Sequence, residues 1–250
     1  MYDRSRQQKW LIPVLHEDEA VIALNKPGGL PVIPERWHPD WPCLKSIAVE
    51  QLQARVWVVH RLDAGTSGVV VLAKTAEAHR NLCEQFTKRR VEKVYLAIVS
   101  GNVEPEEQTI RLPLAPHPKK PGMTIVQNGG KPAITMLRVV ERFRGFTLLE
   151  ARPQTGRQHQ IRVHLQAIGH PLLVDHLYAK TEAFFLSAIK ANYRVKADEH
   201  EQPLIQRLTL HAATLSFTHP LRQELFTLHA PLPKDFNAVI KNLRKYAPSG

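Results

Sequence analysis

Two runs of branched aliphatic residues, separated by a short polar turn, constrain this chain more than any other feature. Residues 56–59 and 69–73 are each typical of a buried strand, because β-branched side chains dominate both. The turn between them contains two glycines and one carboxylate, Asp63. A loop aspartate beside glycine often bonds its own backbone, but a loop held by rigid strands is also a usual place for a working side chain. The spacing therefore predicts a β-rich core that presents Asp63 on a fixed loop.

Hydrophobic periodicity predicts further strands and a smaller number of helices. Strands are expected over residues 11–14, 20–24, 94–99, 108–114, 134–142, 146–152, 208–217 and 223–228, and helices over 44–52, after an N-cap at Thr75, and over 236–246. The stretch 115–131 is rich in proline, glycine and lysine, which indicates an exposed loop. Residues 180–207 have no clear period and are interpreted as an insertion of helical and irregular character. This mixture indicates an α+β fold with one mixed or antiparallel sheet.

Length and composition limit the number of domains, the cellular compartment and the kind of binding partner that can be expected. A chain of 250 residues is enough for one large or two small domains with a sizeable core. Its 34 lysines and arginines outnumber 23 acidic residues, and the net charge of +11 favours a polyanion such as nucleic acid. Cys43 and Cys83 lack CxxC spacing, which indicates neither a zinc cluster nor a disulfide framework. The chain shows no apolar signal core and no apolar run of membrane length, so a cytoplasmic protein is expected.

A second informative block surrounds Arg162. Residues 155–158 have the spacing of a capping box, which predicts a helix that begins near Gly156. Apolar side chains follow at helical spacing, at Ile161, Leu165 and Ile168. His159 and Arg162 share another face, which can point into a cleft, and Arg157 with the amides of the helix start would suit a phosphate. A solvated surface arginine is the ordinary alternative for Arg162.

Rival motifs do not fit the sequence. Residues 129–132 lack the spacing of a phosphate-binding P-loop, and no Ser or Thr follows Lys131. His159 and His164 are five residues apart, whereas a zinc-binding helix places two histidines four apart, and no HExxH motif occurs. No G-x-S-x-G motif of a serine hydrolase is present either. We therefore expect no metal site.

Five blocks of the chain resemble, in order, the RluA class of RNA pseudouridine synthases, which isomerise uridine in RNA. The blocks are residues 25–30, 60–68, 92–97, 155–164 and 210–212, and the resemblance spans roughly residues 18–240. It implies a single catalytic domain over residues 18–250, with a long bent mixed sheet, flanking helices and a central active-site cleft. Residues 1–17 would form an N-terminal extension, too short for the separate S4-type RNA-binding domain that some relatives carry.

The resemblance implies catalytic roles for Asp63, Tyr95 and Arg162. Forming pseudouridine breaks the bond between C1′ and N1 of uridine, rotates the base and rejoins it through C5. This chemistry needs a carboxylate beside a flipped-out nucleotide. Asp63 would attack C1′, add to the base, or remove a sugar proton, and the sequence does not choose among these. Arg162 would form a salt bridge with Asp63, Tyr95 would stack on the target base, and no cofactor is required.

Four further residues are expected to contact the substrate. By the resemblance, Arg61 fills the space that the flipped base leaves in the RNA. Thr66, Arg157 and His159 complete the expected substrate-binding set. The expected partner is thus structured RNA, ribosomal or transfer, bound by a monomeric enzyme that needs no membrane and no metal.

Two positions depart from the pattern of the resembled family. Val174 precedes Asp175 where a glycine is usual, and we expect a local backbone change there without loss of activity because the position lies outside the catalytic blocks. Ala64 stands where many relatives carry a basic residue, which puts the identity of the target more in question than the chemistry.

Two alternative functions stay open at this point. A non-catalytic RNA-binding or RNA-folding protein on the same domain would be indicated by loss of the aspartate, tyrosine or arginine, and all three are present. A metal-dependent nuclease would be inhibited by chelators, whereas the isomerisation would not.

Basic side chains outside these blocks are expected to hold RNA phosphates. They are Lys88, Arg89, Arg90, Lys119 and Lys120.

Removing the charges of Lys119 and Lys120 should weaken RNA binding and flatten its dependence on salt, because fewer counterions are released. Titrations of RNA at several salt concentrations measure both effects, and an unchanged salt slope would show that this loop does not touch the RNA.

Overall fold

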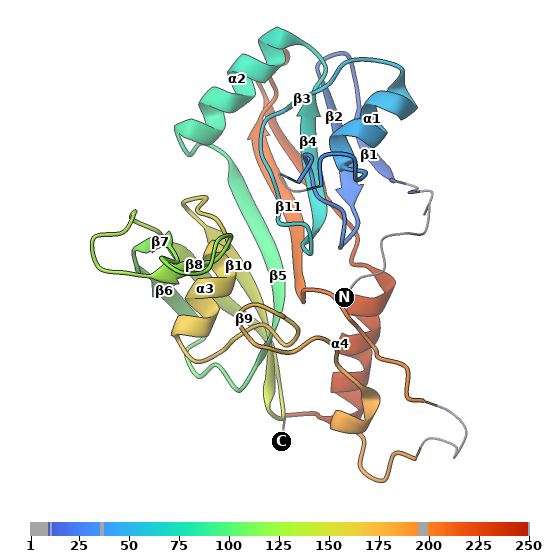
Figure 1. The fold of residues 1–250 in the computed structure, drawn as a ribbon, viewed down its shortest axis with the longest axis vertical. Coiled ribbons are helices and arrows are strands. Elements are labelled where there is room, and N and C mark those ends of the chain that lie inside the picture. Colours follow the sequence, from blue (N-terminus) through green and yellow to red (C-terminus); the bar gives the residue numbers. More distant parts are fainter. Residues whose placement is uncertain (1–9, 11, 36–37, 195–199, 250) are drawn as a thin grey trace.

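The computed structural model describes residues 10, 12–35, 38–194 and 200–249, and one mixed sheet of ten strands dominates it (Figure 1). The strands of this sheet are β1 (Val14–Glu17), β2 (Val21–Lys26), β3 (Trp57–Val58), β4 (Ser67–Ala73), β5 (Glu92–Ser100), β6 (Glu107–Ile110), β9 (Thr135–Phe143), β10 (Phe146–Pro153), β11 (Leu210–Thr218) and β12 (Leu225–His229). The α-helices are α1 (Leu44–Leu52), α2 (Ala76–Thr87), α3 (Gln160–Ala167) and α4 (Lys234–Tyr246). The predicted α+β class is confirmed. Among the described residues, none of the helices is long and apolar enough to span a membrane.

The sheet consists of two halves that share the long strands β5 and β11. Its strand order is β1-β2-β4-β11-β5-β10-β9-β6, with β3 paired to β4 and β12 paired to β11. Only β11 and β4 run parallel among these pairs. Strand β5 pairs with β11 along its first part and with β10 along its second part, so it links the first half (β1–β4, β12) to the second half (β6, β9, β10) (Figure 1).

In the first half, alternation of side chains along the strands buries both faces of the sheet. Val69 and Val71 of β4 face one side and pack in a core that includes Leu82 of α2. Val70 and Leu72 face the other side and pack with the buried residues of α1. Every residue of β4 is buried, which explains why its sequence is apolar without alternation from Val69 to Ala73.

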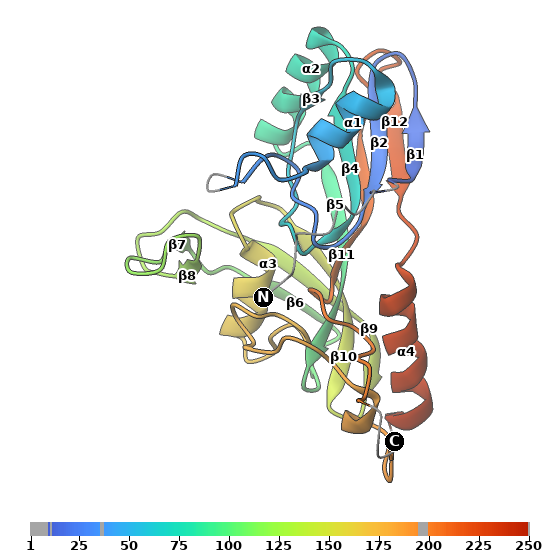
Figure 2. The same ribbon diagram turned by 45° about the vertical axis from the view of Figure 1, so that its right-hand side comes forward.

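In the second half the same alternation places α3 and α4 on opposite faces of the sheet (Figure 2). Leu149 and Ile161 belong to the core under α3, whereas Leu148 and Phe236 belong to the core under α4. The centre of the sheet is therefore covered on both sides, whereas β9 near its edge alternates buried and exposed side chains.

The start of α2 agrees with the prediction from the sequence, whereas the bounds of the first strand do not. The predicted cap of α2 is confirmed, since Thr75 Oγ1 accepts the N–H of Ala78 at 3.1 Å. Strand β1 begins at Val14, so the predicted strand over 11–14 is wrong for residues 12 and 13, and Leu11 lies outside the described residues. Asp18 fixes the turn after β1 by accepting two backbone N–H groups, and β1 pairs with β2 beside that turn. The expected extension 1–17 thus includes a strand of the sheet.

The predicted strand over 108–114 and the loop over 115–131 need correction. Strand β6 ends at Ile110, before Pro113, which has no N–H to donate. A separate two-stranded sheet follows, β7 (Leu114–Pro116) with β8 (Thr124–Val126), and this β7–β8 hairpin projects from the body of the protein (Figures 1 and 2). Strands of three residues are too short to show a period, which is why the composition indicated only a loop.

The segment 180–207 packs as part of the domain. Phe184 and Ile205 exchange backbone hydrogen bonds, and both are buried in the core under α4. A 3-10 helix, η1 (Leu186–Ala188), is its regular element among the described residues. The expected helical and irregular character is confirmed for those residues, and 195–199 lie outside the described residues.

Gly68 is required where β4 lies against both β2 and β11. Its φ is +118°, and a Cβ there would lie 2.1 Å from the carbonyl oxygen of Ala212 on β11.

Gly68→Ala should lower the free energy of unfolding by at least about 2 kcal/mol, from backbone strain and displacement of β11. Gly122→Ala is the control, because Gly122 also has positive φ but no atom within 4 Å of its Cβ position. Urea unfolding measures both, and equal midpoints would contradict the prediction.

Candidate functional site

Asp63 lies on the loop between β3 and β4, at the junction of the two halves of the sheet. The N–H of Thr66 donates to the carbonyl of Asp63 at 3.0 Å and closes a tight turn. Leu62 is 8% exposed and anchors the loop in the core under α1. The Asp63 carboxylate remains 27% exposed, so it is both fixed and accessible.

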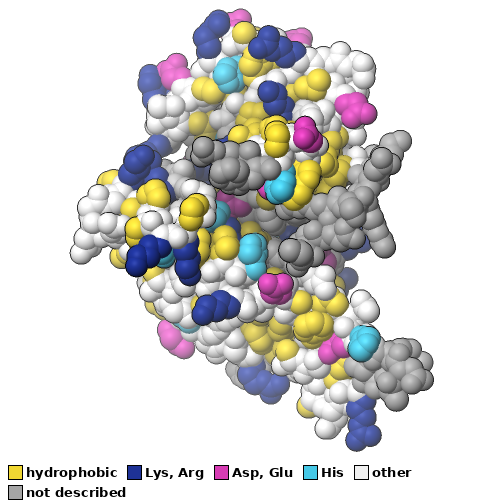
Figure 3. Space-filling view, in the orientation of Figure 1, with side chains coloured by type: hydrophobic (Ala, Val, Ile, Leu, Met, Phe, Trp, Pro, Cys, Tyr) yellow, Lys and Arg dark blue, Asp and Glu magenta, His cyan; other side chains and the backbone are white. Residues whose placement is uncertain are grey.

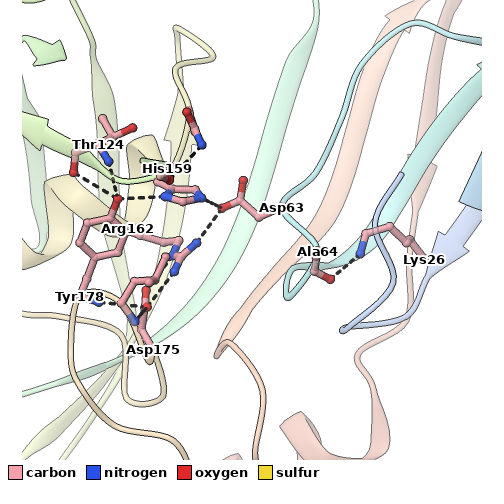
Figure 4. Close-up of polar contacts among 11 residues, drawn as sticks. Lys26, Asp63, Ala64, Thr124, His159, Arg162, Asp175 and Tyr178 are labelled. Atoms are coloured by element: carbon pink, nitrogen blue, oxygen red, sulfur yellow. Dashed lines mark hydrogen bonds and ion pairs between the residues drawn. The ribbon is translucent and has the colours of Figure 1, made fainter. Parts of the chain in front are cut away.

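A buried lysine lies beside this loop and bonds to it at Ala64 (Figure 4). Lys26 ends β2, is fully buried, and donates from Nζ to the carbonyls of Pro27, Leu30 and Ala64 at 2.9, 2.7 and 3.0 Å. Gly29 donates its N–H to the same Ala64 carbonyl at 2.8 Å. Burial lowers the pKa of Lys26 to about 7, against the opposing charge of Asp63. The turn after β2 is thereby tied to the residue that follows Asp63.

Arg162 joins Asp63 to a second carboxylate. It projects from α3 and is 3% exposed, and its Nη1 donates to Asp63 Oδ2 at 3.2 Å. Its Nε and Nη2 donate to the two oxygens of Asp175 at 2.7 and 2.8 Å, the two-point geometry that an arginine makes with a carboxylate. The solvated surface position considered for Arg162 is therefore wrong, and the expected salt bridge is present.

Asp175 was missed by the sequence reasoning. It is 1% exposed and follows Val174, at a position that we had placed outside the catalytic blocks. Besides holding Arg162, its Oδ1 accepts the N–H groups of Leu177 and Tyr178, which fixes the irregular segment that follows. The sequence offered a carboxylate after a run of apolar residues, at a position that belongs to the pattern of the resembled family, but neither signal identifies Arg162 as its partner.

His159 approaches Asp63 from the start of α3. The helix begins at Gln160 and not near Gly156, because the Gln160 side chain accepts from Thr155 Oγ1 at 2.6 Å and from the N–H of Arg157 at 3.1 Å. His159 instead occupies the N-cap with a left-handed backbone (φ +53°). Its Nε2 lies 3.9 Å from Asp63 Oδ2, and burial lowers the pKa of His159 although Asp63 opposes that effect.

Tyr95 lies on β5 at the point where this strand changes partner. Its cross-strand neighbours are Ala151 on β10 and Ala212 on β11, two small residues that leave room for the ring. Burial, together with the charge of Asp63, raises the pKa of Tyr95 well above its usual range. A phenol is already protonated at neutral pH, and this shift makes its proton harder still to remove.

The remaining predicted contact residues differ in accessibility. Arg61 is exposed beside the Asp63 loop, and Arg157 is half-buried with Nε donating to the carbonyl of Pro132 at 3.2 Å. Thr66 is 2% exposed, so the structure places it inside the loop rather than on the surface. Lysine and arginine side chains gather on the part of the surface over the β7–β8 hairpin (Figure 3), where Lys119 and Lys120 are exposed.

One group of described residues, far from Asp63 in the chain, brings together side chains of the types that bind metal ions. His16, Asp18 and His219 bring possible ligand atoms within 4.8 Å of one another. Both imidazole Nε2 atoms lie 2.9 Å from Asp18 Oδ2. Burial opposes the shift, but hydrogen bonds from His16, from the backbone of Val21 and Ala20, and from His219 hold the pKa of Asp18 well below its usual range. His219 Nδ1 accepts the N–H of Arg222, so Nε2 carries the proton and is engaged with Asp18. These hydrogen bonds join the turn after β1 to the turn between β11 and β12, which is a structural role.

Comparisons with known proteins agree with the fold. The profile of the RNA pseudouridylate synthase family matches residues 20–167. Ribosomal large subunit pseudouridine synthase D of Haemophilus ducreyi is 38% identical, over 96% of this chain and 73% of that protein. The enzyme of the same name from Nitrosomonas europaea is also 38% identical, over 97% of this chain and 68% of that protein. Human RNA pseudouridylate synthase domain containing 4 superposes with a TM-score of 0.70 at 26% identity and 92% coverage of both chains.

The chain belongs to the RNA pseudouridylate synthase family and is a member of its RluA class. It is accordingly an RNA pseudouridine synthase, an isomerase that acts on RNA. The resemblance drawn from the five sequence blocks is confirmed.

Replacing Asp175 tests how far the site depends on the buried ion pair. Asp175→Asn keeps the shape but leaves the Arg162 guanidinium with less neutralisation, and we expect a loss of about 3 kcal/mol of unfolding free energy. Asp235→Asn is the matched control, because Asp235 makes the same two-point contact with Arg207 at 37% exposure, where we expect less than about 1 kcal/mol. Similar losses in the two variants, measured by urea unfolding, would contradict this.

The same pair predicts a dependence of stability on pH. Burial raises the pKa of Asp175, but hydrogen bonds and charge from Arg162 outweigh burial and lower it overall. The stabilisation is therefore complete above the unfolded pKa of about 3.9 and is lost as the pH falls through the lower folded value. Unfolding free energies measured in this acid range should fall more steeply for the wild type than for Asp175→Asn, and parallel curves would count against the pairing.

Proposed function

We propose that this enzyme converts uridine to pseudouridine in large-subunit ribosomal RNA, with Asp63 as its catalytic carboxylate. The observation that carries the proposal is the partly exposed Asp63 carboxylate, which accepts a hydrogen bond from the buried Arg162. The RNA class is inferred from relatives, since those of 38% identity are named ribosomal large subunit pseudouridine synthases.

Each of the three residues has a distinct part in the proposed reaction. Asp63 acts on the nucleotide while the C1′–N1 bond breaks, the base turns, and a C1′–C5 bond forms. The proton lost from C5 is balanced by a proton taken up at N1. Arg162 orients the Asp63 carboxylate through Nη1, because Asp175 holds its other nitrogens in place. Tyr95 offers an aromatic face for the base and a phenolic proton, which the raised pKa keeps in place.

The uridine has to leave its stack to reach these groups, because a stacked base hides both C1′ and C5. Arg61 is exposed next to Asp63 and is suited to occupy the space left in the RNA. Arg157 and the lysines of the β7–β8 hairpin lie on exposed or half-exposed surface, where phosphates of the neighbouring nucleotides can be held.

Tritium release from RNA labelled at C5 of uridine tests this proposal directly. RNA from cells that lack the protein, separated into ribosomal and transfer fractions, serves as substrate. We expect release from the ribosomal fraction with the wild type and a loss of at least about 10³-fold with Asp63→Asn. Asp40→Asn, at an exposed aspartate, is the control and should keep wild-type activity.

The possible results separate the parts of the proposal. Release by Asp63→Asn at the wild-type rate would refute the role of Asp63. Release from the transfer RNA fraction alone would refute the proposed RNA class while leaving the chemistry intact.

A further inference from the structure

The hydroxyl of Tyr178 meets three polar groups in the interior of the protein (Figure 4). Tyr178 is 6% exposed and follows Asp175 in the segment that holds Arg162. Its Oη lies 3.0 Å from the N–H of Thr124, 3.1 Å from the carbonyl oxygen of Thr124, and 2.9 Å from Nδ1 of His159. One side chain thus touches both the β7–β8 hairpin and the imidazole beside Asp63.

Thr124 needs this hydroxyl because its backbone faces away from the partner strand. In an antiparallel pair, residues alternate between bonding to the partner and pointing outward. Met123 accepts from the N–H of His117, and the N–H of Gln127 donates to Pro113, so Thr124 falls on the outward position of β8. Thr124 is also only 5% exposed, so its buried carbonyl requires a donor.

The hydrogen-bonding capacity of a phenol then fixes the position of every proton. A phenol oxygen has one proton to donate and two lone pairs. The carbonyl of Thr124 can only accept, so it receives the Tyr178 proton, while the Thr124 N–H takes one lone pair. His159 Nδ1, at 2.9 Å, can then only donate into the second lone pair. All three contacts are satisfied in this one arrangement.

A neutral His159 with its proton on Nδ1 has a bare Nε2, and Nε2 is the atom that faces Asp63. The distance of 3.9 Å between Nε2 and Asp63 Oδ2 is too long for a hydrogen bond, as expected when neither atom carries a proton. The charged and titratable groups that face His159 are Asp63, Arg162, Asp175 and His176. Burial lowers the pKa of His159, which favours the neutral ring.

We propose that Tyr178, docked on the β7–β8 hairpin, is a positioning residue that holds His159 with Nδ1 protonated, so that Nε2 accepts a hydrogen bond from the bound nucleotide beside Asp63. A hydrogen-bond donor of the nucleotide, a hydroxyl or an N–H, fits between these two acceptors. The inference rests on the proposed role of Asp63 and adds a second acceptor to that site.

The arrangement also links the hairpin to the carboxylate. If the hairpin moves away, Tyr178 loses the Thr124 carbonyl and its proton becomes available to His159 Nδ1. The imidazole proton then moves to Nε2, where it can bond Asp63 and compete with the substrate. Docking of the hairpin, which carries the exposed Lys119 and Lys120, therefore keeps Asp63 free for the nucleotide.

Nitrogen NMR of the full-length protein labelled with [15N]histidine tests the inference in the absence of RNA. Correlations from the ring protons distinguish a protonated nitrogen from a bare one, and His159→Gln identifies the His159 signals by their disappearance. We expect a protonated Nδ1 and a bare Nε2 in the wild type. In Tyr178→Phe the ring remains but the hydroxyl is lost, and the proton should move to Nε2. Tyr246→Phe, on α4, is the matched control and should leave His159 unchanged.

Activity supplies the second measurement. Tyr178→Phe should slow single-turnover tritium release by about 10-fold, the loss of one hydrogen bond in the reacting complex, while its affinity for RNA stays within about 2-fold. A wild-type His159 with its proton on Nε2 would overturn the inference, and this result needs no variant to fold. An unchanged tautomer in folded Tyr178→Phe would overturn it too, whereas full activity of Asp63→Asn would instead refute the proposed function.

Discussion

The arrangement of the site depends on one buried guanidinium that lies between two carboxylates. Arg162 belongs to α3 in the second half of the sheet, and Asp63 belongs to the loop before β4 in the first half. A buried arginine without a carboxylate would be strongly unfavourable, and Asp175 supplies that carboxylate permanently through two hydrogen bonds. Asp63 can therefore move from Arg162 toward a substrate without leaving an unpaired charge in the interior. The structure separates the residue that stabilises the arginine from the residue that is free to react.

This ion pair can form because the two halves of the sheet are held in register by shared strands. Strand β5 bonds to β11 and then to β10, and Tyr95 sits where the two sets of pairs overlap. Strand β4 can approach β11 only because Gly68 carries no Cβ. The Lys26 contacts with the loop add a third connection, from the end of β2 to Ala64. The site is thus built at a junction of rigid elements, where small shifts of either half would separate Asp63 from Arg162.

Much of this could be predicted from the sequence, and the failures have physical causes. The buried run of β4 and the cap at Thr75 depend on neighbours in the chain, so periodicity and local chemistry found them. Asp175 was missed because its partner, Arg162, is 13 residues away and the intervening path is irregular. The capping-box spacing at 155–158 predicted the wrong helix start. The Thr155 hydroxyl donates to the side chain of Gln160, and so it does not cap a helix that begins near Gly156. Contacts that depend on three-dimensional proximity leave no periodic signal.

The misplaced start of α3 is also what brings His159 to the site. A helix that began at Gly156 would have made His159 an ordinary helical residue, whereas the observed N-cap has a left-handed backbone. That conformation costs a non-glycine residue roughly 1–2 kcal/mol, and it persists only where the surroundings enforce it. The imidazole of this N-cap residue contacts the Tyr178 hydroxyl, which the buried carbonyl of Thr124 orients in turn. The left-handed N-cap thus accompanies an imidazole that lies between the hairpin and Asp63, and the chemistry of a single phenol decides which of its nitrogens carries the proton.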